Sequence, residues 1–166
     1  MREILPKDLD KNVFNLIGNE WMLVAAQNEE GKVNAMTASW GGLGVMWGKN
    51  VCYVVIRPQR YTKEFVDNSE GFSLTFYAED KKEMLGYMGR VSGRDEDKIK
   101  NAGLTTIVEE GIPYFEEAKI TMLCKKLFKQ RLSENAVLDK EILDKWYPNE
   151  DMHYLYIAEI EKVLVK

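Results

Sequence analysis

Short apolar runs separated by polar turns dominate this chain, and such patterning predicts β-strands more often than helices. The run at 51–56 is almost entirely β-branched, aromatic or cysteine, which predicts a buried strand. The run at 72–77 alternates apolar and polar side chains, as a half-buried strand does. A hairpin-type turn at residues 28–31 separates the runs at 21–27 and 33–40. The expected strands are residues 21–27, 33–40, 51–56, 72–77, 117–128 and 154–165.

Helical patterning is limited to short segments between these runs. Met84, Leu85 and Met88 fall on one side of an expected helix, and Gly103 is placed to stop the one that follows it. Pro148 ends a short amphipathic helix near the C-terminal strand. The expected helices are residues 62–68, 80–88, 95–101 and 140–146. Strands and helices do not alternate regularly, so a mainly β fold, an antiparallel barrel with peripheral helices, is favoured over a doubly wound parallel sheet.

Length and charge narrow the class of protein. The 166 residues, 45% hydrophobic and 30% charged, indicate one domain spanning residues 1–166. A formal net charge of -4 argues against a general nucleic-acid-binding protein. No apolar stretch is long enough to span a membrane, and no secretory signal begins the chain, so a cytoplasmic location is expected. Cys52 and Cys124 are expected as buried free thiols, and no metal site is expected.

The sequence Ile-Arg-Pro-Gln-Arg-Tyr-Thr, residues 56–62, has the chemistry of a phosphate site. Pro58 favours extended geometry at Arg57, so the strand should end there and the chain should turn. Arg60 and Thr62 then fall at the start of the next helix, where Thr62 is a suitable N-cap. A helix N-terminus beside an arginine binds phosphate readily. The alternative is that both arginines pair with surface carboxylates and that Thr62 only caps the helix.

A turn rich in small residues precedes this motif. Thr37 and Ser39 offer hydroxyl groups, Ala38 and the glycines that follow allow close backbone approach, and Trp40 offers an aromatic plate. With the phosphate motif, these residues indicate a phosphorylated, flat, conjugated ligand such as flavin mononucleotide (FMN). Trp40 has an alternative role as an ordinary core or interface aromatic residue.

Four segments resemble one known family. Residues 34–44 together with residues 56–62 resemble the flavin reductase-like, FMN-binding split-barrel family, on its flavoredoxin side. Val-Ser-Gly-Arg-Asp-Glu-Asp-Lys-Ile at 91–99 and His-Tyr-Leu-Tyr-Ile-Ala-Glu-Ile at 153–160 resemble two further stretches of that family. The resemblance covers the chain from about residue 18 onward. It implies a six-stranded antiparallel split β-barrel that forms a homodimer and holds FMN near the dimer interface.

The resemblance also implies roles for individual residues. Thr37, Ala38, Ser39 and Trp40 would line the flavin ring, and Arg57, Arg60 and Thr62 would bind the phosphate. The stretch near the flavin would supply Ser92, Gly93, Arg94 and Lys98, with Lys98 at the phosphate or pyrimidine end of FMN. Ala158 occupies a position where the family often has glycine, which would narrow the space near the ring. The spacing of Ser92 and Asp95 also suits a helix start, so a capping role and a ligand role stay open.

His153 is the only histidine and the only catalytic candidate. An imidazole near a reduced flavin could donate a proton or hold a nicotinamide amide, although a histidine without chemistry is the alternative. The expected activity is that of an oxidoreductase that takes electrons from NAD(P)H or a protein donor. Free flavin, ferric iron, a quinone-like molecule or a redox partner protein would accept them. A non-enzymatic electron carrier and a flavin-binding or sensing module remain alternatives.

Overall fold

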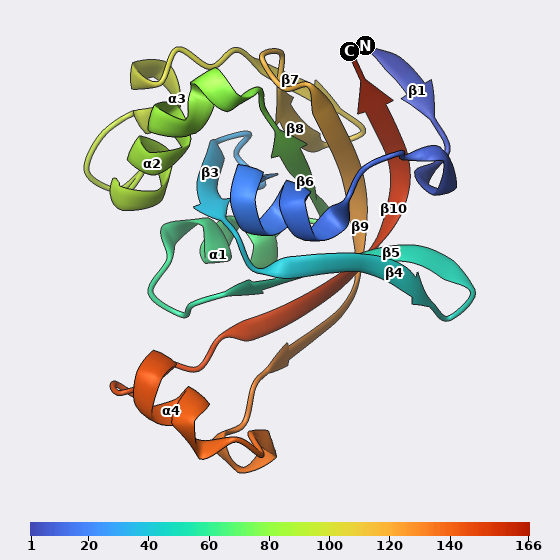
Figure 1. Cartoon of the computed structure of the whole chain (residues 1–166). Helices are drawn as coiled ribbons and strands as arrows, with labels where there is room; N and C mark the ends of the chain where they lie inside the picture. The colour runs from blue at the N-terminus through green and yellow to red at the C-terminus, as the bar shows by residue number, and fades with distance from the viewer.

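An eight-stranded antiparallel sheet organises residues 1–166 of the computed structural model (Figure 1). Its strand order is β3-β2-β6-β9-β10-β5-β4, with β1 paired to β10 beyond the end of β5. The strands are β1 (Arg2–Ile4), β2 (Met22–Gln27), β3 (Val33–Ala38), β4 (Gly41–Met46), β5 (Lys49–Ile56), β6 (Gly71–Phe76), β9 (Ile120–Arg131) and β10 (Tyr154–Val165). A separate hairpin pairs β7 (Thr106–Glu109) with β8 (Ile112–Phe115). The expected fold class is confirmed, with more strands than the six foreseen.

The sheet curls into a barrel that is open at one seam. Met36 of β3 and Leu43 of β4, from opposite ends of the sheet, contact the same interior cluster of buried apolar side chains. Strands β3 and β4 do not pair with each other, and only Ser39 and Trp40 connect them. The open seam of the barrel therefore coincides with residues 37–40, which the sequence indicated as part of a ligand site.

A second layer covers the outer face of β2, β3 and β6. Inward side chains such as Val24 alternate with outward ones such as Leu23 and Ala25, which pack against helix α2 and the segment after it. Both faces of β2 are thus buried, as a continuous apolar run predicts. The helices are α1 (Tyr61–Asp67), α2 (Lys82–Arg90), α3 (Lys98–Asn101) and α4 (Lys140–Trp146). A π-helix at Asn15–Glu20 and 3-10 turns at Pro6–Asp8, Glu79–Lys81 and Glu134–Ala136 complete the elements.

Strand β6 differs from the half-buried strand that its alternating pattern predicted. All of its residues are buried, and β8 packs against its polar face. Ser73 donates a hydrogen bond to the carbonyl of Pro113 at 2.6 Å, and Thr75 shares one with the Tyr77 hydroxyl at 3.0 Å. Its polar side chains are thus satisfied inside the protein rather than by water.

The glycine-rich stretch after Trp40 is a strand, not the turn that the sequence indicated. Gly41 and Gly42 lie in β4 against Tyr53 of β5. A methyl group at Gly42 would overlap the Tyr53 ring, and one at Gly41 would lie 2.5 Å from its carbonyl oxygen. These glycines permit close approach of a neighbouring strand, so strand packing explains them without a ligand.

Two predicted helix starts were also wrong. Helix α1 begins at Tyr61 with Arg60 as N-cap, so Thr62 lies inside the first turn and does not cap it. Helix α3 begins only at Lys98, where the side chain of Asp97 accepts a hydrogen bond from the Lys100 amide at 3.2 Å. Asp97 therefore caps α3, and the helix-start role that was left open for Ser92 and Asp95 is not observed.

Strands β9 and β10 continue beyond the barrel and hold α4 between them. The segment 132–153, called the α4 segment below, extends away from the body of the protein (Figure 1). Helix α4 has the predicted bounds and no buried residue. A backbone hydrogen bond of 2.9 Å from Leu132 to the carbonyl of His153 closes the base of the segment. The buried residues of the segment, Tyr147, Met152 and His153, all follow α4, so the helix itself is held only at its C-terminal end.

Cys52 and Cys124 are buried free thiols on β5 and β9, as predicted. Burial raises the pKa of the Cys124 thiol well above its ordinary value. No group of three or more metal-ligating side chains is arranged to hold a metal ion. None of the helices has the length and apolar character needed to cross a bilayer.

Candidate functional site

Two adjoining cavities lie at the open seam of the barrel. The aromatic cavity, ≈ 190 Å³, is bounded by residues 36–40 on one side and by Trp146 and His153 on the other. The cationic cavity, ≈ 300 Å³, lies between the start of α1 and residues 90–93. Met36, Arg57 and Arg60 line both. All of the sequence-predicted site residues except Arg94 line one cavity or both, so the structure brings together segments far apart in the chain.

Lys98 is the most buried charge of the cationic cavity. It is only 3% exposed, and its ammonium group donates hydrogen bonds of 2.9 Å to the carbonyl oxygens of Met88 and Val91. No carboxylate pairs with it. Burial, reinforced by the positive charge of Arg60, lowers the pKa of Lys98 to about 8. The protein thus holds a poorly compensated cation in this cavity.

Arg60 lies at the junction of the two cavities. Its guanidinium donates a 2.7 Å hydrogen bond to the carbonyl of Gly89, and no carboxylate pairs with it. Burial and the nearby charge of Arg57 lower the pKa of Arg60 below its ordinary value. The suggestion that Arg60 pairs with a surface carboxylate is therefore wrong.

Thr62 and Gly93 form the uncharged wall of the cationic cavity. The Thr62 hydroxyl is buried and accepts a 2.8 Å hydrogen bond from the Asn34 amide, which leaves its own proton free to donate. A methyl group at Gly93 would overlap the Asn34 amide oxygen, so this backbone must pass close to Asn34. The Ser92 hydroxyl accepts a 3.2 Å hydrogen bond from the Arg94 amide. Ser92 thus shapes the loop while it lines the cavity.

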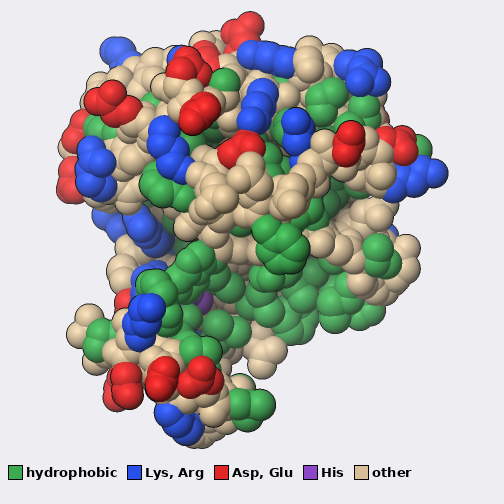
Figure 2. Space-filling model, in the orientation of Figure 1, with side chains coloured by type: hydrophobic (Ala, Val, Ile, Leu, Met, Phe, Trp, Pro, Cys, Tyr) green, Lys and Arg blue, Asp and Glu red, His purple; other side chains and the backbone are tan.

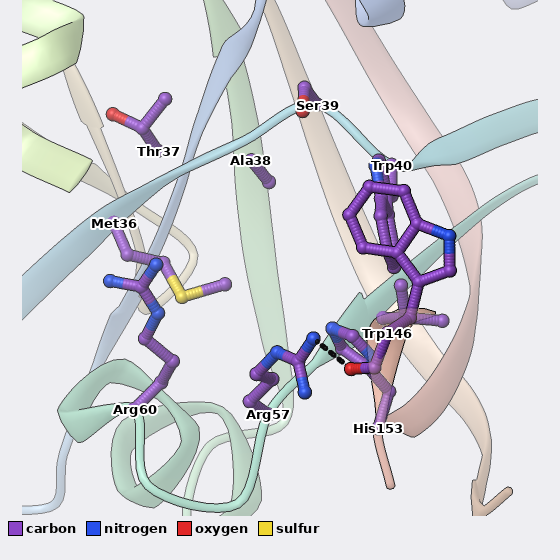
Figure 3. Close-up of a pocket in the computed structure, with 10 residues that line it drawn as sticks. Met36, Thr37, Ala38, Ser39, Trp40, Arg57, Arg60, Trp146 and His153 are labelled. Atoms are coloured by element: carbon purple, nitrogen blue, oxygen red, sulfur yellow. Dashed lines mark hydrogen bonds between the residues drawn. The ribbon is translucent and has the colours of Figure 1, made fainter. Parts of the chain in front are cut away.

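Aromatic rings form the far wall of the aromatic cavity. Trp40 meets Trp146 edge to face, with ring centroids 4.8 Å apart, and lies 5.2 Å from the His153 ring. Figure 3 shows these three side chains grouped on one side, with Arg60 and Met36 on the other. The Thr37 hydroxyl donates to the carbonyl of Leu85 at 2.5 Å, so its oxygen faces a ligand only as an acceptor.

His153 is buried beside the aromatic wall and is neutral at physiological pH. Its Nδ1 atom shares a 2.7 Å hydrogen bond with the Tyr147 hydroxyl. Burial, and then the positive charge of Arg57, lower the pKa of His153 to about 4. Near neutral pH such an imidazole is a hydrogen-bonding side chain, and too little of it is protonated to supply a proton readily.

Arg57 lies between the cavities, and its guanidinium is already held. It forms an ion pair of 2.8 Å with Asp151 and donates a 2.8 Å hydrogen bond to the carbonyl of Trp146 (Figure 3). It also lies over the Tyr147 ring. Arg94, which lines neither cavity, pairs with Glu64 and stacks on Tyr61. Of the predicted cations, Arg60 and Lys98 are the ones without an acidic partner.

Sequence reasoning missed Trp146, Tyr147 and Asn34. The acidic stretch 134–151 is mostly exposed, yet Asp151 pairs with Arg57, and Trp146 lines the aromatic cavity. A tryptophan at the end of a short amphipathic helix was the available signal. Ala158, expected near the ring, is fully buried in the barrel core and lines neither cavity.

The chain belongs to the flavin reductase like domain family, whose model matches residues 14–166. A comparison with curated protein sequences gave no significant match. Among solved structures, the chain is similar to a flavoredoxin from Methanosarcina acetivorans, with 20% identity and a TM-score of 0.70 over 89% of this chain and 68% of that one.

Two further structures share the fold. An FMN-binding protein from Thermus thermophilus with bound p-hydroxybenzaldehyde has 20% identity and a TM-score of 0.70, with 100% of this chain and 82% of that chain covered. Flavoredoxin of Desulfovibrio vulgaris (Miyazaki F) has 20% identity and a TM-score of 0.69, with 98% and 77% covered. At this identity the likeness defines the architecture, and the ligand must be argued from the site itself.

Proposed function

We propose that this protein is an FMN-binding oxidoreductase. The observation that supports it best is the pair of cations, Arg60 and Lys98, that line one cavity without a carboxylate partner. Keeping two such charges away from water is costly unless an anion completes the site. A phosphate dianion supplies two negative charges and several acceptor oxygens, and it fits this donor set.

The two cavities suit the two ends of FMN. In the cationic cavity, Arg60, Lys98, the Thr62 hydroxyl and the backbone at Ser92 and Gly93 would hold the phosphate. In the aromatic cavity, residues 37–40 would line the ring, with Trp40 as an apolar plate. Bound FMN would supply hydride and electron transfer, which no side chain of this chain supplies. The protein would orient the ring, limit the access of water and keep His153 neutral beside it.

The proposed electron donor is NAD(P)H or a protein donor. The acceptor would be free flavin, ferric iron, a quinone-like molecule or a redox partner protein. A second function, a non-enzymatic electron carrier with fixed FMN, is supported by the likeness to two flavoredoxins. The two functions differ in whether a nicotinamide reduces the bound flavin directly.

Anaerobic absorption spectroscopy tests the proposal. The purified protein is supplied with FMN and desalted, and its visible spectrum is recorded as NADH and then NADPH are added. Flavin bands that bleach with a nicotinamide support the reductase and identify its donor. Bands that bleach only with dithionite support the electron carrier. A protein that retains no flavin and gives no binding isotherm with FMN contradicts the proposal as a whole.

We also propose a homodimer, formed through the outer face of β4, β5 and β10. An apolar groove of ≈ 350 Å³ crosses this face, and Val45 and Tyr53 there are 75% and 46% exposed. Hydrophobic side chains gather in the lower part of the view beside the α4 segment (Figure 2). Exposed apolar area of this kind is typical of association surfaces. In sedimentation, the wild type should be a dimer and Val45→Lys should be a monomer. A monomeric wild type contradicts the assignment.

A further inference from the structure

The α4 segment supplies one wall of the aromatic cavity, although none of the residues of α4 is buried. Trp146, 40% exposed, forms that wall together with His153 at the end of the segment. Helix α4 itself has no buried residue, whereas Tyr147, Met152 and His153, which follow it, are buried. The placement of Trp146 at the end of α4 therefore depends on directed contacts as well as on this packing.

Arg57 makes most of those contacts. Its Nη2 atom donates to the carbonyl of Trp146 at 2.8 Å, and its Nη1 atom pairs with the Asp151 carboxylate at 2.8 Å. Gln59 adds a 2.9 Å hydrogen bond to the same carboxylate. Arg57 also lies over the Tyr147 ring, 5.2 Å from its centroid. The Arg57 side chain, just after β5, thus contacts both the end of α4 and Asp151, which lies shortly before β10.

The carbonyl of Trp146 is a C-terminal group of α4 that lacks a partner within the helix. A guanidinium satisfies it and also complements the negative end of the helix. The Asp151 carboxylate pairs with the other amino group, Nη1, of the same guanidinium. This arrangement uses the planar fork of arginine for two acceptors on the same segment.

We propose that Arg57 is a positioning residue that fixes Trp146 as the far wall of the aromatic cavity, and that this wall selects flat, uncharged ring compounds as electron acceptors. The second part rests on the proposed function, while the first does not. Trp40, Trp146 and neutral His153 carry no charge, and aromatic faces stack favourably on a flat ring. Arg57 and Arg60 also line this cavity, but Asp151 pairs with Arg57 and the proposed phosphate would pair with Arg60, so a multiply charged ferric chelate gains no stacking there and loses hydration.

Hydrogen exchange followed by mass spectrometry tests the positioning role without any flavin. Arg57→Ala should speed exchange of the amides of 140–146 at least tenfold, while exchange in β6 and β9 stays as in the wild type. Lys140→Gln, a change at an exposed α4 residue outside both cavities, is the matched control. Unchanged exchange in Arg57→Ala would overturn the positioning role.

Ligand affinities separate this role from direct phosphate binding by Arg57. If Arg57 acts through Trp146, then Arg57→Ala and Trp146→Ala should weaken FMN and riboflavin by the same factor. Adding Arg57→Ala to Trp146→Ala should then change little more. A loss in Arg57→Ala that is at least tenfold larger for FMN than for riboflavin would assign Arg57 to the phosphate and overturn the proposal.

Steady-state kinetics test the selectivity. Menadione is the flat acceptor: NADH gives up a hydride, and the quinone gains its electron pair and its proton together with one proton from solvent to become the hydroquinone. Ferricyanide is the charged acceptor. With ferricyanide, one NADH reduces two ions by one electron each and releases one proton. With FMN held at saturation for each variant, Arg57→Ala and Trp146→Ala should raise KM for menadione at least fivefold more than KM for ferricyanide. Trp146→Phe should restore the low KM. Equal changes for both acceptors would overturn the selectivity, whereas an absence of turnover with either acceptor in the wild type would contradict the proposed function.

Discussion

Replacing Arg60 with alanine should separate the phosphate of FMN from its ring. Arg60 lacks a carboxylate partner, and the only hydrogen bond of its side chain is to the carbonyl of Gly89 at 2.7 Å. Removing it deletes one charge-assisted contact to the proposed phosphate, which is worth about 2 kcal/mol. The dissociation constant for FMN should therefore rise about 30-fold. Riboflavin has no phosphate, and its affinity should change less than threefold.

The stability of the flavin-free protein should respond in the opposite sense. The guanidinium is half-buried and lies near the positive charge of Arg57, and both effects lower its pKa and destabilise its charged form. Its loss should leave the midpoint of thermal unfolding unchanged or raise it slightly. A binding residue that costs stability in the free protein is typical of functional sites.

Flavin fluorescence titrations at low ionic strength measure both affinities, and calorimetry measures the unfolding midpoint. Arg90→Ala is the matched control, because Arg90 lines the same cavity from an exposed position and has no ion pair. It should weaken FMN binding by less than threefold. Equal losses for FMN and riboflavin in Arg60→Ala would refute the phosphate assignment.

Three further predictions follow from the same site. Lys98 has a pKa of about 8, and a bound phosphate would raise that pKa. FMN binding should therefore take up a proton at higher pH. The ratio of FMN affinity to riboflavin affinity should fall several-fold from about pH 7 to 9.5. In Lys98→Met this slope should vanish; a slope that persists in that variant assigns the titration to another group. His153 has a pKa of about 4 when folded against 6.5 as its ordinary value, so the unfolded chain binds more protons between these limits, and about 3 kcal/mol of stability should be lost as pH falls through that window. Urea unfolding of His153→Gln at several pH values should lack this loss, and an identical pH profile in the variant would count against the assignment. Gly93→Ala should displace Asn34 and weaken FMN binding more than tenfold with a smaller effect on riboflavin, as measured by the same titrations, and near-normal FMN affinity would show that the loop adapts.

The strands were predictable because burial imposes a strict pattern on them. The apolar runs at β2, β5 and β10 matched the structure closely, and so did the amphipathic pattern of α4. Strand β4 was missed because Gly41 and Gly42 have no side chains from which an alternating pattern can be read. Glycine is needed at both positions because Tyr53 on the neighbouring strand leaves no room for a side chain.

Site residues were predictable as a set but not in their individual contacts. The motif at 56–62 indicated two equivalent arginines, yet the fold holds Arg57 on Asp151 and leaves Arg60 without an acid. Asp151 is 94 positions away in the sequence, and no local pattern reports such a pair. Trp146 was missed for the same reason, because its role depends on the path of a segment that lies outside the barrel.

The long strand β10 also determines when the site can exist. It pairs with β1, β5 and β9. His153, the residue just before β10, lines the aromatic cavity. During synthesis, residues 37–62 leave the ribosome long before these partners are made. Non-local pairing of this kind is slow and leaves strand edges exposed until it is complete. We therefore expect a nascent chain to acquire its cofactor only after residue 165 has emerged, so flavin supply should act on the finished barrel and not on its early folding.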